Sequence, residues 1–326
     1  MVWNGKREEE KEDEQLEKLV DAILSKSSGC RKEDSGEEEL PMKKRRRRGK
    51  RDDNNNSKDS FQGKDDVKKT SDINNNTVSL HSLWVNYNSS WKHSNAIFAF
   101  DSSCWRHVAG PASITEHLSF VSSPKSDGQK GVAKPTPPSY PIPLYFPPTV
   151  FRQANLDSFT NIVGRIRERV MTLDQKPFCV ELYGGVGTIS LYLSDAVSGL
   201  VSSDENPNNY KCFCDSVKQL PKDVQPRLTY KQKNAAEMVK TESELFQQAE
   251  LLILDPPRKG LEEEVVEYLC KSEECSSIKL LVYVSCGFQA FQRDCDALLE
   301  SGRWKVESAE GNVLFPGSAL AFFVPK

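Results

Sequence analysis

The sequence predicts an α/β fold built around a Rossmann-like parallel sheet. Three largely apolar segments of four to six residues, at positions 178–183, 251–254 and 280–284, each end in a turn rich in glycine, proline or polar residues. Apolar runs of this length are typical of strands buried on both faces. The third run precedes apolar residues at helical spacing, namely Phe288, Phe291, Cys295 and Leu298. Strands that alternate with helices favour a parallel sheet covered on both faces.

The composition indicates a globular part diluted by a polar part. Of the 326 residues, 37% are hydrophobic and 28% are charged, and the mean hydropathy is -0.58. The formal net charge of -3 conceals local runs of both signs, so it indicates no class of partner. No apolar run reaches the roughly eighteen residues of a membrane span, and the N-terminus is too acidic for a signal or transit peptide. We expect a soluble intracellular monomer without membrane contact.

The cysteines do not have the spacing of a metal site or a disulfide framework. There are nine, without any C-x-x-C pair, and the closest two, Cys212 and Cys214, would point to different sides of a helix. This pattern argues against a zinc ribbon, an iron–sulfur site or a secreted disulfide scaffold. We therefore expect no metal.

Residues 1–77 are expected to be a mostly disordered charged tail with one amphipathic helix. Within residues 7–26, the apolar side chains recur at helical spacing, at Leu16, Leu19, Val20, Ile23 and Leu24. This helix could dock on its own domain or bind a partner. Residues 30–77 are almost without apolar side chains and cannot bury enough surface to fold. The basic run at 43–51 fits a nuclear address or an RNA-contacting tail, and cytoplasm or an organelle stay open as alternatives.

Residues 78–145 form a small aromatic-rich region, for which we expect an α+β structure. Strand-like segments lie at 83–87 and 96–100, with Trp91, Trp105 and His107 between and after them. These rings could form a base-stacking surface, but a core for an accessory sheet is the favoured interpretation. Residues 122–143 are rich in Pro, Ser, Gly and Lys and read as an inserted linker.

Residues 146–326 are the expected catalytic domain, and its first motif is a glycine turn. A helical pattern over 153–169 leads to the strand at 178–183, which ends in Gly184, Gly185 and Gly187, with a helix expected from Thr188 onward. Glycines at such a turn let backbone N–H groups approach a nucleotide-like cofactor. The order G-G-x-G departs from the dinucleotide fingerprint. Glu181 before the turn and Asp204, 17 residues after Gly187, fit S-adenosylmethionine better, with Asp204 accepting from the ribose hydroxyls.

Three further polar residues follow predicted strands. Asn234 follows a strand at 227–230, where it could meet an adenine ring, and Asp255 begins the loop Asp-Pro-Pro-Arg at 255–258. The two prolines make that loop stiff. Cys286 follows the strand at 280–284. Carboxyl ends of parallel strands share one sheet edge, where ligands bind, so a reactive Cys286 competes there with the simpler interpretation of a small buried side chain.

Taken together, four ordered motifs resemble the RNA (uracil-5-)-methyltransferase family, class I S-adenosylmethionine-dependent enzymes that form 5-methyluridine in tRNA and ribosomal RNA. The motifs are Gln153 with Asn155, residues 181–187, residues 255–258, and Ser285 with Cys286. The resemblance covers about residues 146–316 and, more loosely, 84–118. It implies a class I methyltransferase sheet, an RNA partner, and cofactor contacts from Gln153, Tyr183, Thr188, Asp204 and Asp255, with Asn234 as an addition. It also implies that Cys286 is the nucleophile.

The chemistry explains the need for a thiol. C5 of uracil is a poor nucleophile, and a thiolate that adds at C6 turns the ring into an enolate whose C5 can attack a methyl group. We expect the pKa of the Cys286 thiol to be lowered by Arg258 or by the N-terminus of the helix that begins at Phe288. The flipped-out base would enter this pocket.

Completion of the reaction requires a general base that removes the C5 proton. In the family this is a glutamate after a Phe-Pro loop, with a histidine just ahead of it. Residues 315–318 begin such a loop, but residues 319–324 enter the last strand at once, and no histidine follows His117. Glu307 and Glu310 are candidate replacements. The family's N-terminal TRAM barrel also has no counterpart among the polar residues before 78.

Three hypotheses remain open at this point. The first is an active RNA C5-uracil methyltransferase. The second is a catalytically impaired paralogue or variant, lacking the base, that binds RNA or a partner. The third is a methyltransferase for protein or small molecules.

Overall fold

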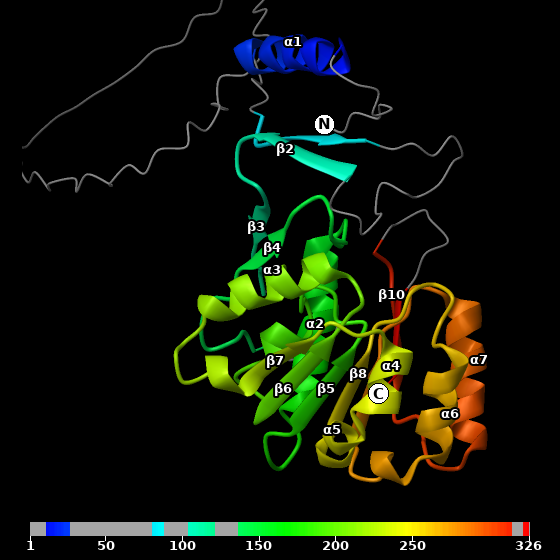
Figure 1. The fold of residues 1–326 in the computed structure, drawn as a ribbon. Coiled ribbons are helices and arrows are strands. Elements are labelled where there is room, and N and C mark those ends of the chain that lie inside the picture. The colour runs from blue at the N-terminus through cyan, green and yellow to red at the C-terminus, as the bar shows by residue number, and fades with distance from the viewer. Residues whose placement is uncertain (1–10, 27–79, 88–103, 121–135, 315–321, 326) are drawn as a thin grey trace, which may run out of the picture. The chain divides into compact units, whose positions relative to one another are not determined.

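A computed structural model describes residues 11–26, 80–87, 104–120, 136–314 and 322–325 (Figure 1). Its centre is a five-stranded sheet in the order β7-β6-β5-β8-β9, in which every strand pair is parallel. The strands are β5 (Phe178–Leu182), β6 (Gly199–Ser203), β7 (Leu228–Lys231), β8 (Leu251–Leu254) and β9 (Leu280–Tyr283). The three strands predicted from apolar runs are thus confirmed within one or two residues.

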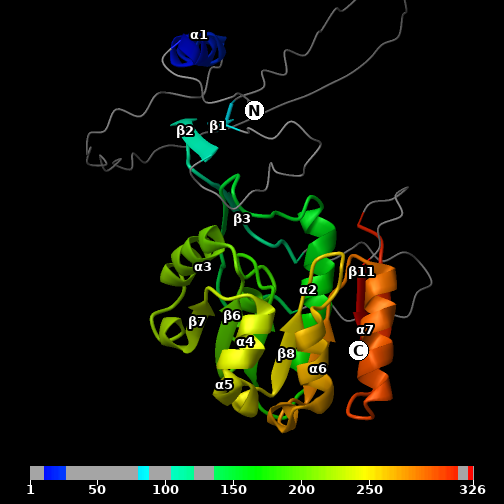
Figure 2. The ribbon, with the colours of Figure 1, turned by 45° about the vertical axis from the view of Figure 1, so that its right-hand side comes forward.

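Helices cover both faces of this sheet (Figures 1 and 2). One face packs against α2 (Leu156–Val170) and α3 (Pro207–Lys218). The other packs against α4 (Ala235–Thr241), α5 (Ser243–Gln248), α6 (Glu263–Lys271) and α7 (Phe288–Glu300). Each face therefore has its own apolar core, and strand residues alternate between them because successive side chains point to opposite sides.

The helix expected directly after the glycine turn is much shorter than predicted. Residues 186–196 form turns around one 3₁₀ helix, η3 (Ser190–Leu193), and β6 begins only a few residues later. Its side chains are buried, with Leu191 and Leu193 fully enclosed. A tighter 3₁₀ turn is common in short connections of this kind. Two more 3₁₀ helices connect elements, η4 (Gln225–Arg227) and η5 (Glu273–Cys275).

Among the described residues, six strands outside the main sheet form three two-stranded sheets. β3 (Ile114–Glu116) pairs with β4 (Leu144–Phe146), and β10 (Ala309–Asn312) pairs with β11 (Phe322–Pro325). β1 (Leu83–Asn86) and β2 (Trp105–Ala109) form a further two-stranded sheet. The strand at 83–87 is confirmed, whereas the segment at 96–100 and Trp91 lie outside the described residues.

In the β1–β2 sheet, Trp84 stacks on His107 with ring centroids 4.6 Å apart, and Trp105 is buried. These contacts fit the favoured interpretation of a small core. Where the structure describes residues 78–145, it shows strands and turns but no α-helix.

The predicted N-terminal helix is α1 (Lys11–Lys26). Of its expected apolar face, Val20 is buried and Leu19 and Ile23 are half-buried, while Glu17 and Lys18 are exposed. The basic run at 43–51 and the rest of the tail lie outside the described residues. Among the described helices, none is both long enough and apolar enough for a membrane span.

Candidate functional site

The predicted site residues follow the last residues of neighbouring strands. In the sheet register, Leu182 stands opposite Ser203 on one side and Leu254 on the other, and Leu254 stands opposite Tyr283. Asp204 and Asp255 directly follow two of these residues, and Cys286 comes three residues after Tyr283. The structure therefore brings the glycine turn, both aspartates and the cysteine to the carboxyl edge of one sheet.

The glycine turn depends on glycine at all three of its glycine positions. A Cβ at Gly184 would overlap Ser202 Oγ and lie 2.5 Å from Glu181 Oε2, and Gly187 has φ +85°. Gly185, with φ +56°, has open space where its Cβ would be. Hydrogen bonds hold the turn, because the Gly184 N–H donates to Ser203 O at 2.8 Å and Tyr230 Oη donates to Gly185 O at 3.0 Å. The loop thus exposes backbone on its open side.

Tyr183, at the start of this turn, has φ 60° and is the only non-glycine residue with positive φ in the described chain. A bulky residue in this region of φ/ψ is strained, and such strain clusters at functional sites. Its hydroxyl donates to Glu262 Oε2, and its ring packs against the core on the α6 side. Burial and Glu262 raise the pKa of the Tyr183 phenol. Its hydroxyl is therefore engaged by Glu262, which leaves the backbone and the ring as the groups that could contact a ligand.

Three carboxylates gather at the same edge. Glu181 is buried and accepts from Ser202 Oγ at 2.5 Å, and burial raises its pKa to about 7. Asp204 accepts from the backbone of Gly185 and Asn206. Burial, followed by repulsion from Glu181 and Asp204, raises the pKa of Asp255 to about 8. Such a cluster disfavours further negative charge and favours a cationic ligand.

Cys286 is half-buried at the edge of the core on the α2 side. The expectation of a lowered thiol pKa is wrong for the free chain. Burial and the Asp255 carboxylate raise the pKa of Cys286, and Arg258 acts in the opposite, lowering direction. The expected influence of Arg258 is thus present but outweighed, because removal from water disfavours the thiolate more strongly. Phe288, expected on the buried side of α7, is 55% exposed in its first turn.

Two residues that sequence reasoning missed hold the loop at 255–261. Asp294 is 1% exposed and accepts hydrogen bonds from Leu261 N and Tyr283 Oη, both at 2.8 Å. Glu262 accepts a hydrogen bond from the Tyr183 hydroxyl and forms an ion pair with Lys259 Nζ at 2.9 Å. The sequence does carry a signal for Asp294. Asp294 lies three residues after Phe291 and four before Leu298, so helical spacing places this charged residue on the buried side of α7.

Asn234 has a structural role. It is exposed, and its side-chain oxygen caps α4 by accepting from Glu237 N at 2.8 Å. An N-cap Asn three residues before Glu is a recognisable helix start. Thr188 and Gln153 are both half-buried, in the glycine turn and just before α2.

Asn155 connects the start of α2 to the C-terminal segment. It caps α2 by accepting from Ser158 N at 3.0 Å, and its Nδ2 donates to Leu314 O at 2.8 Å. Asn155 and Leu314 line a cavity of about 650 Å³ together with His117 and Arg152. The loop that begins at Phe315, after which the sequence lacks the family's glutamate-bearing segment, lies outside the described residues.

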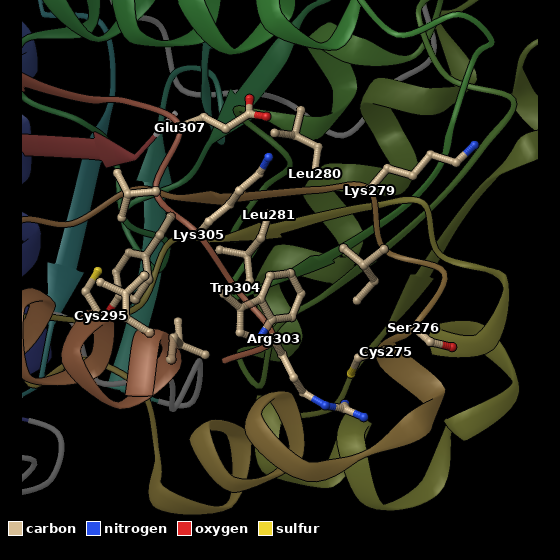
Figure 3. A pocket seen from close by; sticks show the side chains of 15 residues that line it. Cys275, Ser276, Lys279, Leu280, Leu281, Cys295, Arg303, Trp304, Lys305 and Glu307 are labelled. Carbon is tan, nitrogen blue, oxygen red and sulfur yellow. The ribbon is translucent and has the colours of Figure 1, made fainter. Parts of the chain in front are cut away.

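Glu307 and Glu310 are not brought to Cys286. Glu307 pairs with Arg169, and Glu310 lies 3.6 Å from Arg165, both in the second half of α2. α2 runs toward the amino end of β5, away from the carboxyl edge. Glu307 instead lines a separate cavity of about 360 Å³ along β9, with Cys275, Trp304 and Arg303 (Figure 3). Neither Cys286 nor any of the expected cofactor contacts lines that cavity. Within the described residues, no group of three or more His, Cys, Asp or Glu side chains could hold a metal.

The chain is similar in sequence to bacterial RNA methyltransferases. A protein named as an uncharacterised RNA methyltransferase of Protochlamydia amoebophila is 33% identical over 238 residues, which are 73% of this chain and 52% of that protein. The resemblance to RNA methyltransferases is confirmed. The 23S rRNA (uracil(1939)-C(5))-methyltransferase RlmD of Francisella tularensis is 26% identical over 183 residues, or 55% of this chain and 38% of that enzyme. No family model matches the chain.

The fold is similar to that of a Pyrococcus abyssi tRNA (uracil-54, C5)-methyltransferase, solved in complex with S-adenosyl-L-homocysteine. The TM-score is 0.51 at 18% sequence identity, over 77% of this chain and 51% of that chain. The predicted Rossmann-like class I methyltransferase fold is thereby confirmed. This chain spans about half the length of these relatives.

Proposed function

We propose that the chain is an S-adenosylmethionine-dependent RNA methyltransferase that methylates C5 of a uridine in tRNA or rRNA. The observation that carries the proposal is the meeting of Cys286 with the Asp255 loop at the carboxyl edge of the sheet, beside the glycine turn. The sequence similarity to RNA methyltransferases, RlmD among them, supports the same substrate class.

The site fits the proposed cofactor in shape and charge. The glycine turn leaves open space at Gly185, so a ligand can reach its backbone. The three carboxylates Glu181, Asp204 and Asp255 repel one another, and a cationic ligand relieves that repulsion. When bound, S-adenosylmethionine supplies an electrophilic methyl group on a positively charged sulfur. The residues that would hold it are Gln153, the backbone of Tyr183, the glycine turn, Thr188, Asp204 and Asp255. Asn234 would act indirectly, by capping the start of α4.

Cys286 is the proposed nucleophile. Its thiolate adds to C6 of the flipped-out uracil, which breaks the C5=C6 double bond and leaves C5 electron-rich. The raised pKa of the free thiol means that its proton must be removed on substrate binding, and Arg258 stabilises the resulting thiolate. The stiff loop with Pro256 and Pro257 holds Arg258 against this strand end.

The test uses RNA in which uridine is replaced by 5-fluorouridine. C5 of this base accepts a methyl group but has no proton to lose, so the cysteine stays attached. Wild-type chain and Cys295→Ser, a half-buried thiol in α7 that serves as the matched control, should form a denaturation-resistant adduct with such tRNA or rRNA. Cys286→Ser should form none. An absence of adduct from the wild type with both RNAs would refute the uracil mechanism, and methyl transfer by Cys286→Ser would favour a different class of methyltransferase.

A second candidate is a catalytically impaired RNA-binding or partner-binding chain. It is favoured by the sequence after Ser318, which passes directly into the last strand without the expected glutamate-bearing segment. Such a chain would form the adduct but release at most one methylated uridine per molecule. Multiple turnovers on unmodified RNA would rule it out.

A further inference from the structure

The proposed reaction requires a proton acceptor close to Cys286. After methyl transfer, C5 carries both the new methyl group and its original hydrogen, and the cysteine leaves only when that hydrogen is removed as a proton. Glu307 and Glu310 are paired with arginines of α2 and do not serve the site. The acceptor must therefore be sought among the carboxylates at the carboxyl edge.

The three carboxylates at this edge share one face of the sheet with Cys286. Residues two positions apart in a strand point to the same side. Cys179, Leu200 and Ile253 pack in the core on the α2 side. Glu181 and Asp255 follow Cys179 and Ile253 by two positions, and Asp204 follows Leu200 by four, so all three carboxylates point to that side. Cys286 packs against the same core. The four functional groups therefore converge rather than lying on opposite faces.

Two of the three carboxylates already accept hydrogen bonds from other groups of the protein. Glu181 accepts from Ser202, and Asp204 accepts from Gly185 N, Asn206 N and Asn209 Nδ2. For Asp255, the interactions found within the described chain are burial and the charges of Glu181 and Asp204, without a hydrogen-bond donor. Its oxygens are the ones left to accept a proton from a substrate.

Asp255 is also the carboxylate that acts on the Cys286 thiol. Its charge is the second contribution, after burial, to the raised pKa of Cys286. The two loops touch, because a Cβ at Gly287 would overlap the Arg258 carbonyl oxygen. A group with a pKa near neutrality is suited to proton transfer at neutral pH, and that of Asp255 is raised to about 8.

We propose that Asp255 is the general base that removes the C5 proton and so completes the reaction. This proposal rests on the proposed function. In the step, an Asp255 oxygen bonds to the C5 hydrogen, the C5–H electron pair becomes the C5=C6 double bond, and the C6–S bond breaks with its electrons on sulfur. Asp255 ends protonated, Cys286 ends as a thiolate, and 5-methyluracil leaves.

The experiment follows the fate of the covalent adduct on two RNAs. Asp255→Asn keeps the shape of the side chain and removes the proton acceptor. With 5-fluorouridine RNA and saturating S-adenosylmethionine it should still form the methylated adduct, although more slowly than the wild type, because Asp255 is also one of the residues proposed to hold the cofactor. With RNA carrying tritium at C5 of uridine, it should accumulate a methyl-labelled, denaturation-resistant adduct, and tritium release should fall by about 100-fold or more. Glu263→Gln, which changes an exposed carboxylate in the first turn of α6, is the control and should release tritium without accumulating adduct.

Each other outcome contradicts the proposal in a distinguishable way. Tritium release at the wild-type rate by Asp255→Asn would remove Asp255 from this step. Failure of Asp255→Asn to form the 5-fluorouridine adduct, with folding and cofactor binding retained, would assign it an earlier role and likewise overturn the proposal. If the wild type itself forms no adduct, the proposed function fails as well. Asp255→Ser repeats the comparison with a second neutral side chain and should give the same pattern.

Discussion

The backbone of Gly287 packs so closely against the carbonyl of Arg258 that no side chain fits between them. A Cβ at position 287 would overlap the Arg258 carbonyl oxygen and lie 3.2 Å from the Arg258 Cα. The Asp-Pro-Pro-Arg loop and the Cys286 loop are therefore fixed to each other through main-chain contact. This contact explains how Asp255 and Arg258 both influence the same thiol.

Gly287→Ala should separate the two loops without unfolding the chain. The obstacle is backbone, which cannot rotate away, so we expect a loss of about 1–3 kcal/mol in the free energy of unfolding from overpacking. A displacement of about 1 Å at a reactive centre lowers rates by about 100-fold, and the rate of 5-fluorouridine adduct formation should fall by that order. Gly199→Ala is the control, because its Cβ would press on the Phe178 ring and reach only ordinary contact, 3.7 Å, with the Arg227 carbonyl oxygen, at the far end of the sheet. Equal adduct rates in the two variants would contradict this interpretation.

The sequence predicted the sheet edge better than the contacts that organise it. Apolar runs locate strand ends, and parallel strands share a carboxyl edge, so Asp204, Asp255 and Cys286 could be grouped from spacing alone. The contact of the Tyr183 hydroxyl with Glu262 and the hydrogen bond from Leu261 to Asp294 could not, because they join residues 79 and 33 positions apart.

The prediction of a lowered pKa for the Cys286 thiol was wrong for a related reason. Arg258 is visible in the sequence, but the burial and the Asp255 charge that outweigh it arise from packing. At Asn234 the sequence carries two signals, because Asn234 followed by Glu237 also marks a helix start, and the structure shows that cap.

Arg258→Gln should make Cys286 less reactive toward iodoacetamide. The guanidinium lowers the pKa of the thiol, so its removal raises that pKa further and reduces the thiolate fraction at neutral pH. The rate of alkylation, measured from pH 7 to 10 by mass spectrometry of the Cys286 peptide, should shift to higher pH. Lys259→Gln removes a neighbouring charge that pairs with Glu262 instead and should leave the profile unchanged. An unshifted profile for Arg258→Gln would show that Arg258 does not stabilise the thiolate.

Asp255→Asn should stabilise the cofactor-free chain more at pH 8 than at pH 5. The pKa of Asp255 is about 8 in the folded chain and about 4 when unfolded, so the folded state holds more protons between these values. Stability therefore falls as pH rises through this window, and asparagine removes that loss. Urea unfolding at both pH values measures the difference.

Asp215→Asn is the control of opposite sign. Lys218 lowers the pKa of Asp215, so the contribution of this carboxylate is present at pH 8 and lost only in acid. Asp215→Asn should therefore be slightly destabilising at pH 8. A pH-independent effect of Asp255→Asn would mean that its carboxyl group is not perturbed by folding.

Arg167→Met should destabilise the whole domain without a direct effect on the site. Arg167 is 2% exposed and forms a two-pronged pair with Asp195, with Nη1 to Oδ1 at 2.5 Å and Nη2 to Oδ2 at 2.8 Å. Removing one member of a buried pair costs about 3–5 kcal/mol because the other charge stays buried and unpaired. The double variant Arg167→Met with Asp195→Leu should recover part of that loss. Lys211→Met, from an exposed pair with Asp215, should change the urea midpoint far less. Equal losses for Arg167→Met and Lys211→Met would contradict this account.

Asp294→Ala should loosen the loop that carries Asp255 and Arg258. The variant leaves two buried donors, Leu261 N and Tyr283 Oη, without their acceptor, and each unsatisfied donor costs about 1–3 kcal/mol. Tyr283→Phe removes one of these donors together with its need for a partner, so it should cost less alone and should recover part of the loss in the Asp294→Ala background. A double-mutant cycle in urea measures this coupling. Because Asp294 also limits the space at Gly260, its loss frees the loop as well as weakening the fold. Adduct formation by Asp294→Ala should therefore fall further than that of Arg167→Met at matched fractions of folded chain, and an equal fall would mean that Asp294 supports stability alone.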